Sequence, residues 1–274
     1  MSQIHSTAVS YAGTELNYAC DRARLPAELR ERFVPLGLDD ETRAFIDAAA
    51  ASRHGRALAA THRLLGWFLS DFDVNGLLGT YPLFLLSSEQ WRAVLGPERV
   101  ERYLDVGAGS GDVTARIAEL ASEVVTSETS WAMARRLERR GFDCLRADLA
   151  EVELKERFDL VTCLNVIDRS GRPGTLLARL ARALSPGGRL VVATPLPYAP
   201  FVYAGGTTRA PAERLPLDAG DWESGVAKLA ERVLVPLGLE LLALTRAPYI
   251  SGGDPGRPLY VLDDAVVVCR KEPA

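Results

Sequence analysis

A glycine-rich run spans residues 104–112 with the sequence LDVGAGSGD, between a short apolar segment and a helix-like one. Glycine at every second position lets a backbone approach a ligand without a Cβ clash, and the start of a helix presents unpaired N–H groups. Gly107, Gly109 and Gly111 therefore predict a cofactor cradle. The alternative is a tight turn that needs glycine for its geometry alone.

The residues around this run distinguish between cofactors. The dinucleotide fingerprint G-x-G-x-x-G needs a glycine at position 112, where the chain has Asp112. That carboxylate disfavours a pyrophosphate at the helix N-terminus. Asp105, ahead of the first glycine, suits a ligand that carries an ammonium and a sulfonium. We therefore predict S-adenosyl-L-methionine, with S-adenosyl-L-homocysteine as its product, and disfavour a nicotinamide dinucleotide.

Two more carboxylates follow strand-like segments. Glu128 comes after residues 123–127, where a carboxylate can accept hydrogen bonds from both hydroxyls of a ribose. Asp148 comes after residues 142–147, where it could face the amino group of an adenine. A solvated side chain near a helix start is the alternative for Glu128, and a surface loop carboxylate is an equal alternative for Asp148.

Asn165 and Asp168 follow the fourth strand-like segment, residues 158–164. Ligands of an open parallel sheet lie beyond the carboxyl ends of its strands, so these side chains should face the group that the cofactor transfers. Helix capping by a short polar side chain is the alternative. Two such side chains three residues apart, beside an apolar strand, favour the functional interpretation.

Six motifs spread over the chain carry a resemblance to a known family. They are NGLLG at 75–79, LDVGAGSGDVT at 104–114, TSETS at 126–130, CLNVIDR at 163–169, RAPY at 246–249 and YVLDDAVVV at 260–268. From about residue 39 to the C-terminus, the chain resembles the DREV family, that of methyltransferase-like protein nine. The glycine run alone marks only the superfamily, whereas CLN-x-x-DR and YVLDDAV are specific to this family.

The resemblance implies a protein-histidine methyltransferase that uses S-adenosyl-L-methionine. It implies transfer to Nδ1 (pros), the ring nitrogen nearer the backbone, of histidines in His-x-His segments with a small middle residue, giving 1-methylhistidine. Proteins that carry such segments would be the partners. The chain departs from the family because it shows no long N-terminal leader with a secretory-type apolar stretch.

The chemistry of this transfer assigns roles to the residues. A neutral imidazole already offers a lone pair at neutral pH, because its pKa is about 6.5. A carboxylate that accepts the Nε2–H bond fixes the tautomer, frees Nδ1 and stabilises the growing positive charge. We assign that role to Asp168, and expect Asn165 and Tyr249 to orient the cofactor or the imidazole. The predicted cofactor contacts are Asp105, Gly107, Gly109, Gly111, Glu128, Asp148 and Asn165.

The elements that must position these residues follow from the apolar pattern. From residue 102 onward strand-like and helix-like segments alternate, which predicts a parallel sheet with helices on both faces. Strands at 239–245 and 260–270, joined by a loop at 247–258, should pair as an antiparallel hairpin on a sheet edge. Together with the resemblance, this predicts an α/β class I methyltransferase fold, Rossmann-like and seven-stranded.

Residues 26–95 have apolar side chains at helical spacing instead, without strand-like alternation. We therefore expect an N-terminal helical cap at 1–100, followed by a methyltransferase domain at 101–274. His54 and His62 lie in the cap and are expected on a helix surface or in its packing rather than as bases.

The composition excludes several classes of protein. The 274 residues carry 32 Lys and Arg against 36 Asp and Glu, and the net charge of −4 argues against binding nucleic acid or an anionic membrane. The four cysteines form no C-x-x-C pair, so we expect no metal site and no disulfide framework. Polar and charged residues interrupt the most apolar stretch, 64–86, so we expect no membrane insertion and a cytoplasmic protein.

Two other functions stay open at this point. A small-molecule methyltransferase acting on a phenol or an amine would use the helical cap to enclose a compact pocket. A non-catalytic scaffold that only binds the cofactor is disfavoured because the glycine run, Asp105 and Glu128 are all intact. Asp263 and Asp264 are either an irregularity in an edge strand or an acidic pair that faces the substrate.

Overall fold

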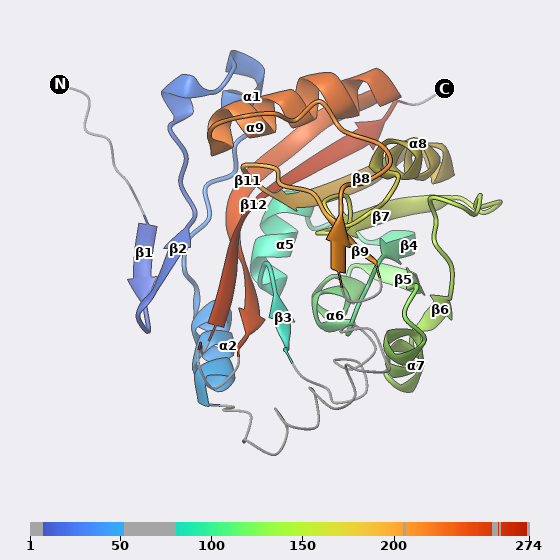
Figure 1. Cartoon of the computed structure of the whole chain (residues 1–274), viewed down its shortest axis with the longest axis horizontal. Helices are drawn as coiled ribbons and strands as arrows, with labels where there is room; N and C mark the ends of the chain where they lie inside the picture. Colours follow the sequence, from blue (N-terminus) through green and yellow to red (C-terminus); the bar gives the residue numbers. More distant parts are fainter. Residues whose placement is uncertain (1–7, 52–80, 205–206, 254–256, 258, 273–274) are drawn as a thin grey trace.

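The computed structural model describes residues 8–51, 81–204, 207–253, 257 and 259–272. Its central feature is a sheet with the strand order β3-β11-β12-β8-β7-β4-β5-β6 (Figure 1). The strands are β3 (Leu83–Phe84), β4 (Val100–Val106), β5 (Ala121–Ser127), β6 (Asp143–Leu145), β7 (Phe158–Leu164), β8 (Leu184–Pro195), β11 (Leu239–Gly252) and β12 (Leu259–Lys271). Strands β4 to β8 run parallel, while β12 is antiparallel to both of its neighbours.

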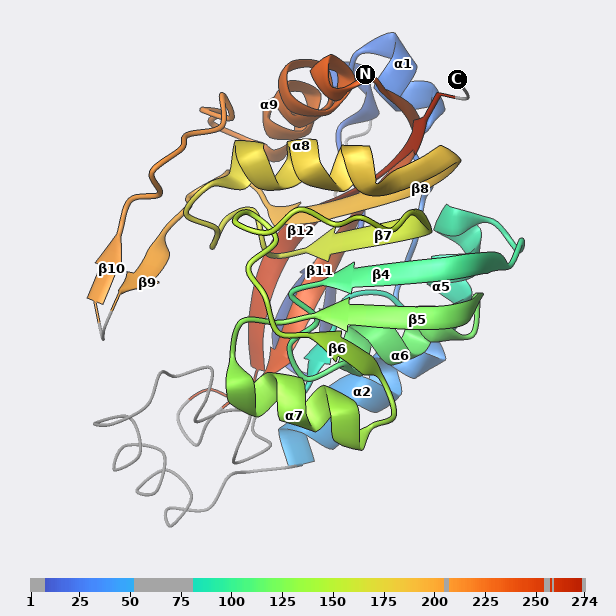
Figure 2. The ribbon, with the colours of Figure 1, turned by 90° about the vertical axis from the view of Figure 1, so that its right-hand side faces the viewer.

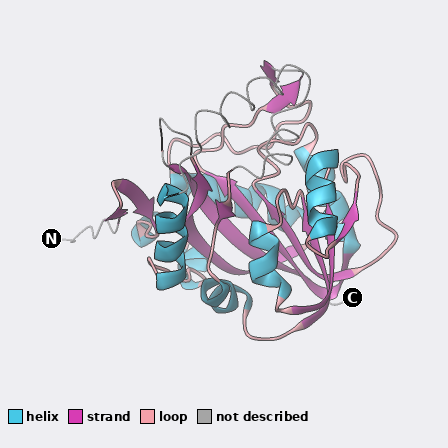
Figure 3. Ribbon diagram, turned by 90° about the horizontal axis from the view of Figure 1, so that it is seen from below, coloured by secondary structure: helices cyan, strands magenta, loops and turns pink. Residues whose placement is uncertain are grey.

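Strand β7 shows why the sheet needs cover on both faces. Its sequence FDLVTCL is mostly apolar, which is typical of a parallel strand buried on both sides. Val161 packs in one core, with α1 (Ala27–Glu31), α8 (Pro173–Ala183) and α9 (Trp222–Lys228). Leu160 packs in the other, with α5 (Ser88–Leu95) and α6 (Asp112–Ala118). Figure 2 and Figure 3 show these helices on the two sides of the twisted sheet.

The predicted fold class is confirmed. Seven strands in the order β6-β5-β4-β7-β8-β12-β11 form a Rossmann-like sheet with a parallel core and a C-terminal antiparallel hairpin. The structure adds β3 as an eighth strand, which pairs with β11 through Phe84 and Ile250. The short strand β3, rather than the β11–β12 hairpin, therefore forms this edge of the sheet.

The expectation of a purely helical N-terminal part is wrong in the described residues. Helices α1, α2 (Asp40–Ala51) and α5 are present, but β1 (Ala8–Tyr11) and β2 (Thr14–Asn17) form a hairpin and β3 joins the main sheet. Strands β2 and β3 are stabilised by burial of their apolar side chains against the C-terminal strands, because Leu16, Phe84 and Ile250 share one apolar cluster. His54, His62 and the NGLLG motif lie outside the described residues. The domain boundary at residue 100 stays a prediction.

The prediction of a loop at 247–258 is also wrong for residues 247–252. Strand β11 continues to Gly252, and each residue from Ala247 to Gly252 pairs with one on β12. Pro248 is tolerated within this strand, since only Ile250 and Ser251 pair with β3 on its other edge. The longer hairpin carries Tyr249 to the carboxyl ends of the parallel strands.

Three smaller elements complete the described chain. Helix α7 (Trp131–Arg139) follows β5 and packs beside β6, and β9 (Val202–Ala204) pairs with β10 (Thr207–Arg209) in a separate hairpin. Within the described ranges, none of the helices combines the length and the apolar character that a membrane crossing requires.

Candidate active site

The glycine run forms the turn between β4 and α6, with a left-handed backbone at Gly107 (φ 65°) and Gly111 (φ 76°). A Cβ on Gly107 would lie 2.6 Å from Cγ2 of Val166, and one on Gly111 would lie 2.8 Å from Cδ2 of Leu137. Both glycines are therefore required by backbone conformation and by close packing. The turn thus packs against Val166, beyond β7, at its first glycine and against Leu137 of α7 at its last.

A Gly107→Ala substitution should destabilise the protein by more than the left-handed backbone alone explains. That backbone costs an L-residue about 1–2 kcal/mol, and the clash with Val166 adds to it. Gly141→Ala is the matched control, because Gly141 has φ 86° and a Cβ added there would have nothing within 4 Å. Urea unfolding should show the larger loss for Gly107→Ala, and equal losses would contradict the close contact.

Asp105 lies under the glycine turn and is only 3% exposed. Its carboxylate accepts hydrogen bonds from the hydroxyls of Thr114 at 2.5 Å and Thr162 at 2.6 Å. Burial raises the pKa of Asp105 to about 6, although these two hydroxyls counteract the shift. Both oxygens are thus engaged by the chain itself, and a contact with the cofactor ammonium stays a prediction.

The raised pKa of Asp105 predicts that the contribution of this side chain to the free energy of unfolding depends on pH. Because the folded-state pKa is about 6 and the ordinary value is 3.8, the native state binds the proton more tightly than the unfolded state. The contribution of Asp105 is therefore fully present below about pH 4 and is lost as the pH rises through about 6. We expect the difference in unfolding free energy between wild type and Asp105→Asn to decrease over this range. A difference that stays constant from pH 4 to 7 would be inconsistent with this assignment.

Glu128 follows β5 and anchors the glycine turn. Its Oε2 accepts a hydrogen bond from the Gly109 N–H at 3.0 Å, and its Oε1 accepts from the N–H groups of Thr129 at 2.7 Å and Ser130 at 3.0 Å. Each carboxylate oxygen has two lone pairs, so Oε2 keeps one for a further donor. The position and the spare acceptor fit the predicted ribose contact.

Asp112 begins α6 and is held from three sides. It accepts hydrogen bonds from Arg140 at 2.6 Å, from the hydroxyl of Ser110 at 2.7 Å and from the Leu83 N–H at 3.2 Å. Burial alone would raise the pKa of Asp112, but the hydrogen bonds outweigh burial and lower it. The Asp112 carboxylate is therefore ionised, and both of its oxygens already accept hydrogen bonds from the chain. It also ties β3 to the glycine turn, a role that sequence patterns did not reveal.

Asp148 follows β6, in the turn after that strand. Its side chain is exposed, and Oδ1 accepts a hydrogen bond from the Ala150 N–H at 2.8 Å, which caps the turn after β6. This matches the surface-loop alternative as far as the chain's own contacts go, and a contact with adenine stays a prediction.

Asn165 is the first residue beyond β7 and has a left-handed backbone with φ 57°. Its N–H donates to the Ala193 carbonyl at 2.9 Å, and its Nδ2 donates to Oδ2 of Asp264 at 2.7 Å. Its Oδ1 is buried and accepts from no donor in the described part of the chain. A buried acceptor without a donor is costly, which points to a ligand that supplies the donor.

Asp168 is 1% exposed, and neither of its carboxylate oxygens accepts a hydrogen bond from any described residue. Nη1 of Arg169 lies 2.6 Å from Oδ2, but that nitrogen is aligned on the main-chain oxygen of Asp168 at 3.0 Å. The contact is therefore an ion pair without an aligned hydrogen bond. The Arg169 guanidinium is held over the ring of Phe201 at 3.8 Å. Oδ1 of Asp168 is therefore available as an acceptor, while Oδ2 is held by the charge of Arg169.

The ion pair with Arg169 should set the pKa of Asp168. Burial raises the pKa of this carboxyl, and the positive charge of Arg169 partly offsets the rise. An Arg169→Gln substitution should therefore raise the pKa of Asp168 further. Carboxyl ¹³C titration by NMR measures this value directly, and a lowered or unchanged pKa in the variant would show that Arg169 does not act on Asp168.

The structure brings Tyr249 to the same place. Burial raises the pKa of this partly buried phenol, and the nearby carboxylates of Asp264, Asp168, Asp112 and Asp105 raise it further. Tyr249 lies two residues after Ala247, the partner of Asp264 on β12, and so shares the strand face of Asp264, which contacts Asn165.

Asp263 and Asp264 point to opposite faces of β12, as adjacent residues of a strand must. Asp263 forms a two-point ion pair with Arg246, at 2.8 and 2.5 Å, and the same arginine donates to the Ala19 carbonyl at 2.9 Å. Asp263 is therefore structural, while Asp264 contacts Asn165 in the candidate site. The interrupted apolar pattern marks the pair in the sequence, but the hydrogen bond from Asn165 shows that Asp264 is the member that faces the site.

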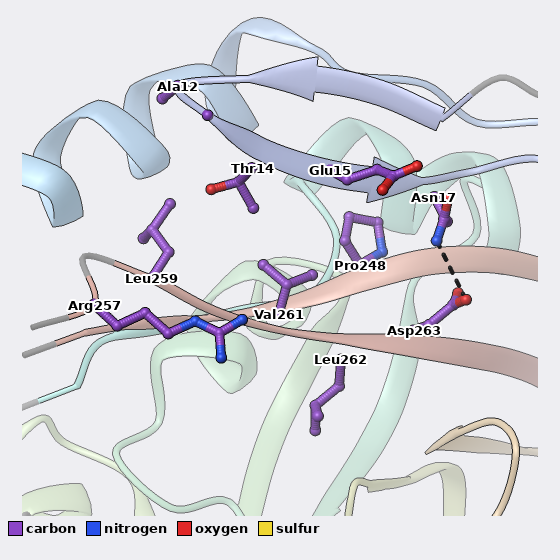
Figure 4. Close-up of a pocket in the computed structure, with 11 residues that line it drawn as sticks. Ala12, Thr14, Glu15, Asn17, Pro248, Arg257, Leu259, Val261, Leu262 and Asp263 are labelled. Atoms are coloured by element: carbon purple, nitrogen blue, oxygen red, sulfur yellow. Dashed lines mark hydrogen bonds between the residues drawn. The ribbon is translucent and has the colours of Figure 1, made fainter.

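A groove of about 540 Å³ opens elsewhere, between the β1–β2 and β11–β12 hairpins (Figure 4). Glu15 lines one wall, and Val261 and Asp263 line the other. The two β12 residues share a strand face, opposite to that of Asp264. Because the glycine turn contributes nothing to its lining, this groove is separate from the candidate active site.

The sequence profile of the DREV methyltransferase family matches residues 17–271, nearly the whole chain. The chain belongs to the DREV methyltransferase family. The resemblance of its motifs to that family is thereby confirmed, and the cofactor is S-adenosyl-L-methionine.

More distant relatives match shorter parts of the DREV methyltransferase. The ubiquinone biosynthesis O-methyltransferase of Bradyrhizobium sp. (strain ORS 278) is 32% identical over 99 residues, which cover 34% of this chain and 39% of that enzyme. The corresponding enzyme of Idiomarina loihiensis is 29% identical over 102 residues, covering 34% and 42%. The chain thus spans about two fifths of the length of these curated relatives.

Solved structures with a similar fold include the N-methyltransferase NodS from Bradyrhizobium japonicum WM9. NodS in complex with S-adenosyl-L-homocysteine is 14% identical, with a TM-score of 0.44, and the match covers 85% of this chain and 99% of that one.

The residues of the DREV methyltransferase site fit the cofactor. The glycine turn leaves the backbone open at Gly109, where the nearest atom to an added Cβ is 3.9 Å away, and Glu128 keeps acceptor capacity beside it. Among the described ranges, no three His, Cys, Asp or Glu side chains are grouped to hold a metal ion.

Proposed function

We propose that this enzyme methylates Nδ1 of histidine in His-x-His segments of proteins. The observation that carries the proposal is the buried carboxylate of Asp168, which lies beyond β7 with Oδ1 unpartnered among the described residues and Oδ2 in an ion pair with Arg169. Asn165 adds a second buried acceptor, its Oδ1. A pocket with several acceptors suits a substrate that presents N–H groups.

An imidazole fits this set of acceptors. When bound, S-adenosyl-L-methionine supplies an electrophilic methyl group. Asp168 would accept the Nε2–H bond, which leaves the Nδ1 lone pair free and stabilises the positive charge that develops on the ring. No strong base is needed, because imidazole is largely neutral at pH 7. Tyr249 would place an aromatic face and a hydroxyl beside the ring.

The specificity for Nδ1 follows from which edge of the ring is bound. If Asp168 holds the Nε2–H edge, the opposite edge faces the cofactor, and the proton cannot be on Nδ1 in the same tautomer. Protein segments of the His-x-His type are the proposed partners. The net charge of −4 is compatible with partly cationic histidine segments rather than with nucleic acid.

A small-molecule O-methyltransferase is the second candidate. The partial match to ubiquinone biosynthesis O-methyltransferases favours it, although that match covers only 34% of this chain. In this case Asp168 would remove the proton of a phenol instead of orienting a neutral ring. The buried acceptors alone do not separate the two substrates.

The experiment that separates them uses labelled S-adenosyl-L-methionine. The protein is incubated with a His-Ala-His peptide, with the same peptide carrying Ala in place of both histidines, and with catechol-type phenols. We expect label on the histidine peptide, and mass spectrometry of the hydrolysate should identify the Nδ1 isomer. Label confined to phenols would establish the second candidate, and label on Nε2 would contradict the proposed orientation.

A further inference from the structure

Asp264 is a buried acid to which the proposed reaction assigns no role. It lies on β12 opposite Ala247 of β11 and Pro195 of β8, and it is 0% exposed. Within the part of the chain that the structure describes, no ion pair includes it. Its one hydrogen bond there is the contact between its Oδ2 and Nδ2 of Asn165 at 2.7 Å. A buried acid without a cation is costly, so its position calls for an explanation.

Asn165 is fixed at both its backbone and its side chain. The left-handed backbone with φ 57° is stabilised by the hydrogen bond from its N–H to the Ala193 carbonyl at 2.9 Å. A side-chain amide has donors on one atom and an acceptor on the other, so binding one end determines what the other end presents. Since Asp264 occupies Nδ2, the other end of Asn165 is Oδ1, which is buried without a donor from the described residues.

We propose that Asp264 is a positioning residue that holds the amide of Asn165 with its carbonyl oxygen toward the methyl acceptor. The candidate site then presents two buried acceptors without a donor among the described residues, Oδ1 of Asn165 and Oδ1 of Asp168. An imidazole N–H finds partners there, whereas a substrate oxygen that carries only lone pairs does not. This inference rests on the proposed histidine methylation and explains how the pocket holds a substrate ring by a proton that the ring carries.

The protonation state of Asp264 does not change this role. Burial raises the pKa of Asp264 well above its usual range, and the neighbouring charge of Asp168 adds to the rise. A neutral carboxyl group still has a carbonyl oxygen that accepts a hydrogen bond. Asn165 can therefore donate to this oxygen whether Asp264 is neutral or ionised. An asparagine at position 264 also keeps such an oxygen, whereas a leucine does not.

The first test compares Asp264→Asn with Asp264→Leu by NMR of the side-chain amide of Asn165 in the cofactor-free protein. We expect Asp264→Asn to keep the shifted, slowly exchanging signal, and Asp264→Leu to move it to that of a free amide. Peptide kcat/KM should fall about 10²-fold for Asp264→Leu and much less for Asp264→Asn. Asp263→Asn is the control on the opposite strand face and should leave the Asn165 signal unchanged. An unchanged signal in Asp264→Leu would overturn the proposal.

The second test exchanges the two side chains and does not depend on Asp264→Leu folding. Asn165→Asp alone places two carboxyl groups against each other and should lower kcat/KM about 10²-fold. Adding Asp264→Asn places an amide donor at position 264 against a carboxylate acceptor at position 165. The second carboxylate oxygen at position 165 still faces the substrate. Recovery of at least about tenfold supports the positioning role, and no recovery contradicts it. If wild type does not methylate histidine at all, the proposed function fails, while the NMR comparison still decides the role of Asp264.

Discussion

Replacing Asp168 by Asn is expected to slow methyl transfer to a His-x-His peptide by about 10² to 10⁴-fold, with cofactor affinity nearly unchanged. The substitution keeps the size of a side chain that is 1% exposed, but the amide can turn an N–H toward the substrate and cannot stabilise a positive ring. Single-turnover rates with labelled cofactor measure the first effect, and calorimetry measures the second.

The matched control is Asp143→Asn, the same chemical change on an exposed residue of β6. It should leave both rate and affinity as in wild type. Near wild-type turnover by Asp168→Asn would remove the basis for assigning the carboxylate to the imidazole. A parallel loss of cofactor affinity would instead place Asp168 in the cofactor site.

Glu128→Ala is expected to weaken cofactor binding by at least about 100-fold, because hydrogen bonds to a charged group contribute roughly 1.5–3 kcal/mol each. The loss has two sources. The carboxylate offers an acceptor to the ribose, and it holds the glycine turn through the Gly109 N–H at 3.0 Å. Isothermal titration with S-adenosyl-L-homocysteine measures the affinity without turnover.

Glu119→Ala serves as the comparison for this variant, because Glu119 follows α6 and pairs only with Arg92 among the described side chains, at 2.6 Å. It should bind the cofactor as wild type does. An affinity for Glu128→Ala within a few-fold of wild type would show that the ribose lies elsewhere and that the contact to Gly109 is dispensable.

The parts of the fold that could be predicted are those in which one local pattern decides the structure. Residues 158–164 are apolar on both faces, and the glycine turn that follows β4 needs its left-handed backbone at Gly107. These signals located the carboxyl edge of the sheet and the residues beyond it. Asn165 and Asp168 lie beyond β7, and Tyr249 shares the strand face of Asp264, which contacts Asn165, while the catalytic roles of the three stay predictions.

The parts that could not be predicted depend on contacts between distant segments. Strand β3 has only two residues, and its pairing with Ile250 stabilises it more than its own sequence does. The stretch after Ala247 has the proline and glycine content of a loop, but its hydrogen bonds to β12 make it a strand. Likewise, adjacent aspartates at 263 and 264 must face opposite sides, but the sequence alone does not show which one meets Asn165.

A structure of the protein with S-adenosyl-L-homocysteine and a His-Ala-His peptide would show directly whether Asp168 binds the target imidazole. We predict a carboxylate oxygen of Asp168 about 2.6–3.2 Å from Nε2 of the target histidine, with Nδ1 pointing at the cofactor sulfur. An Asp168 side chain that contacts only Arg169 while the imidazole lies elsewhere would contradict the account, and so would a ring that presents Nε2 to the sulfur.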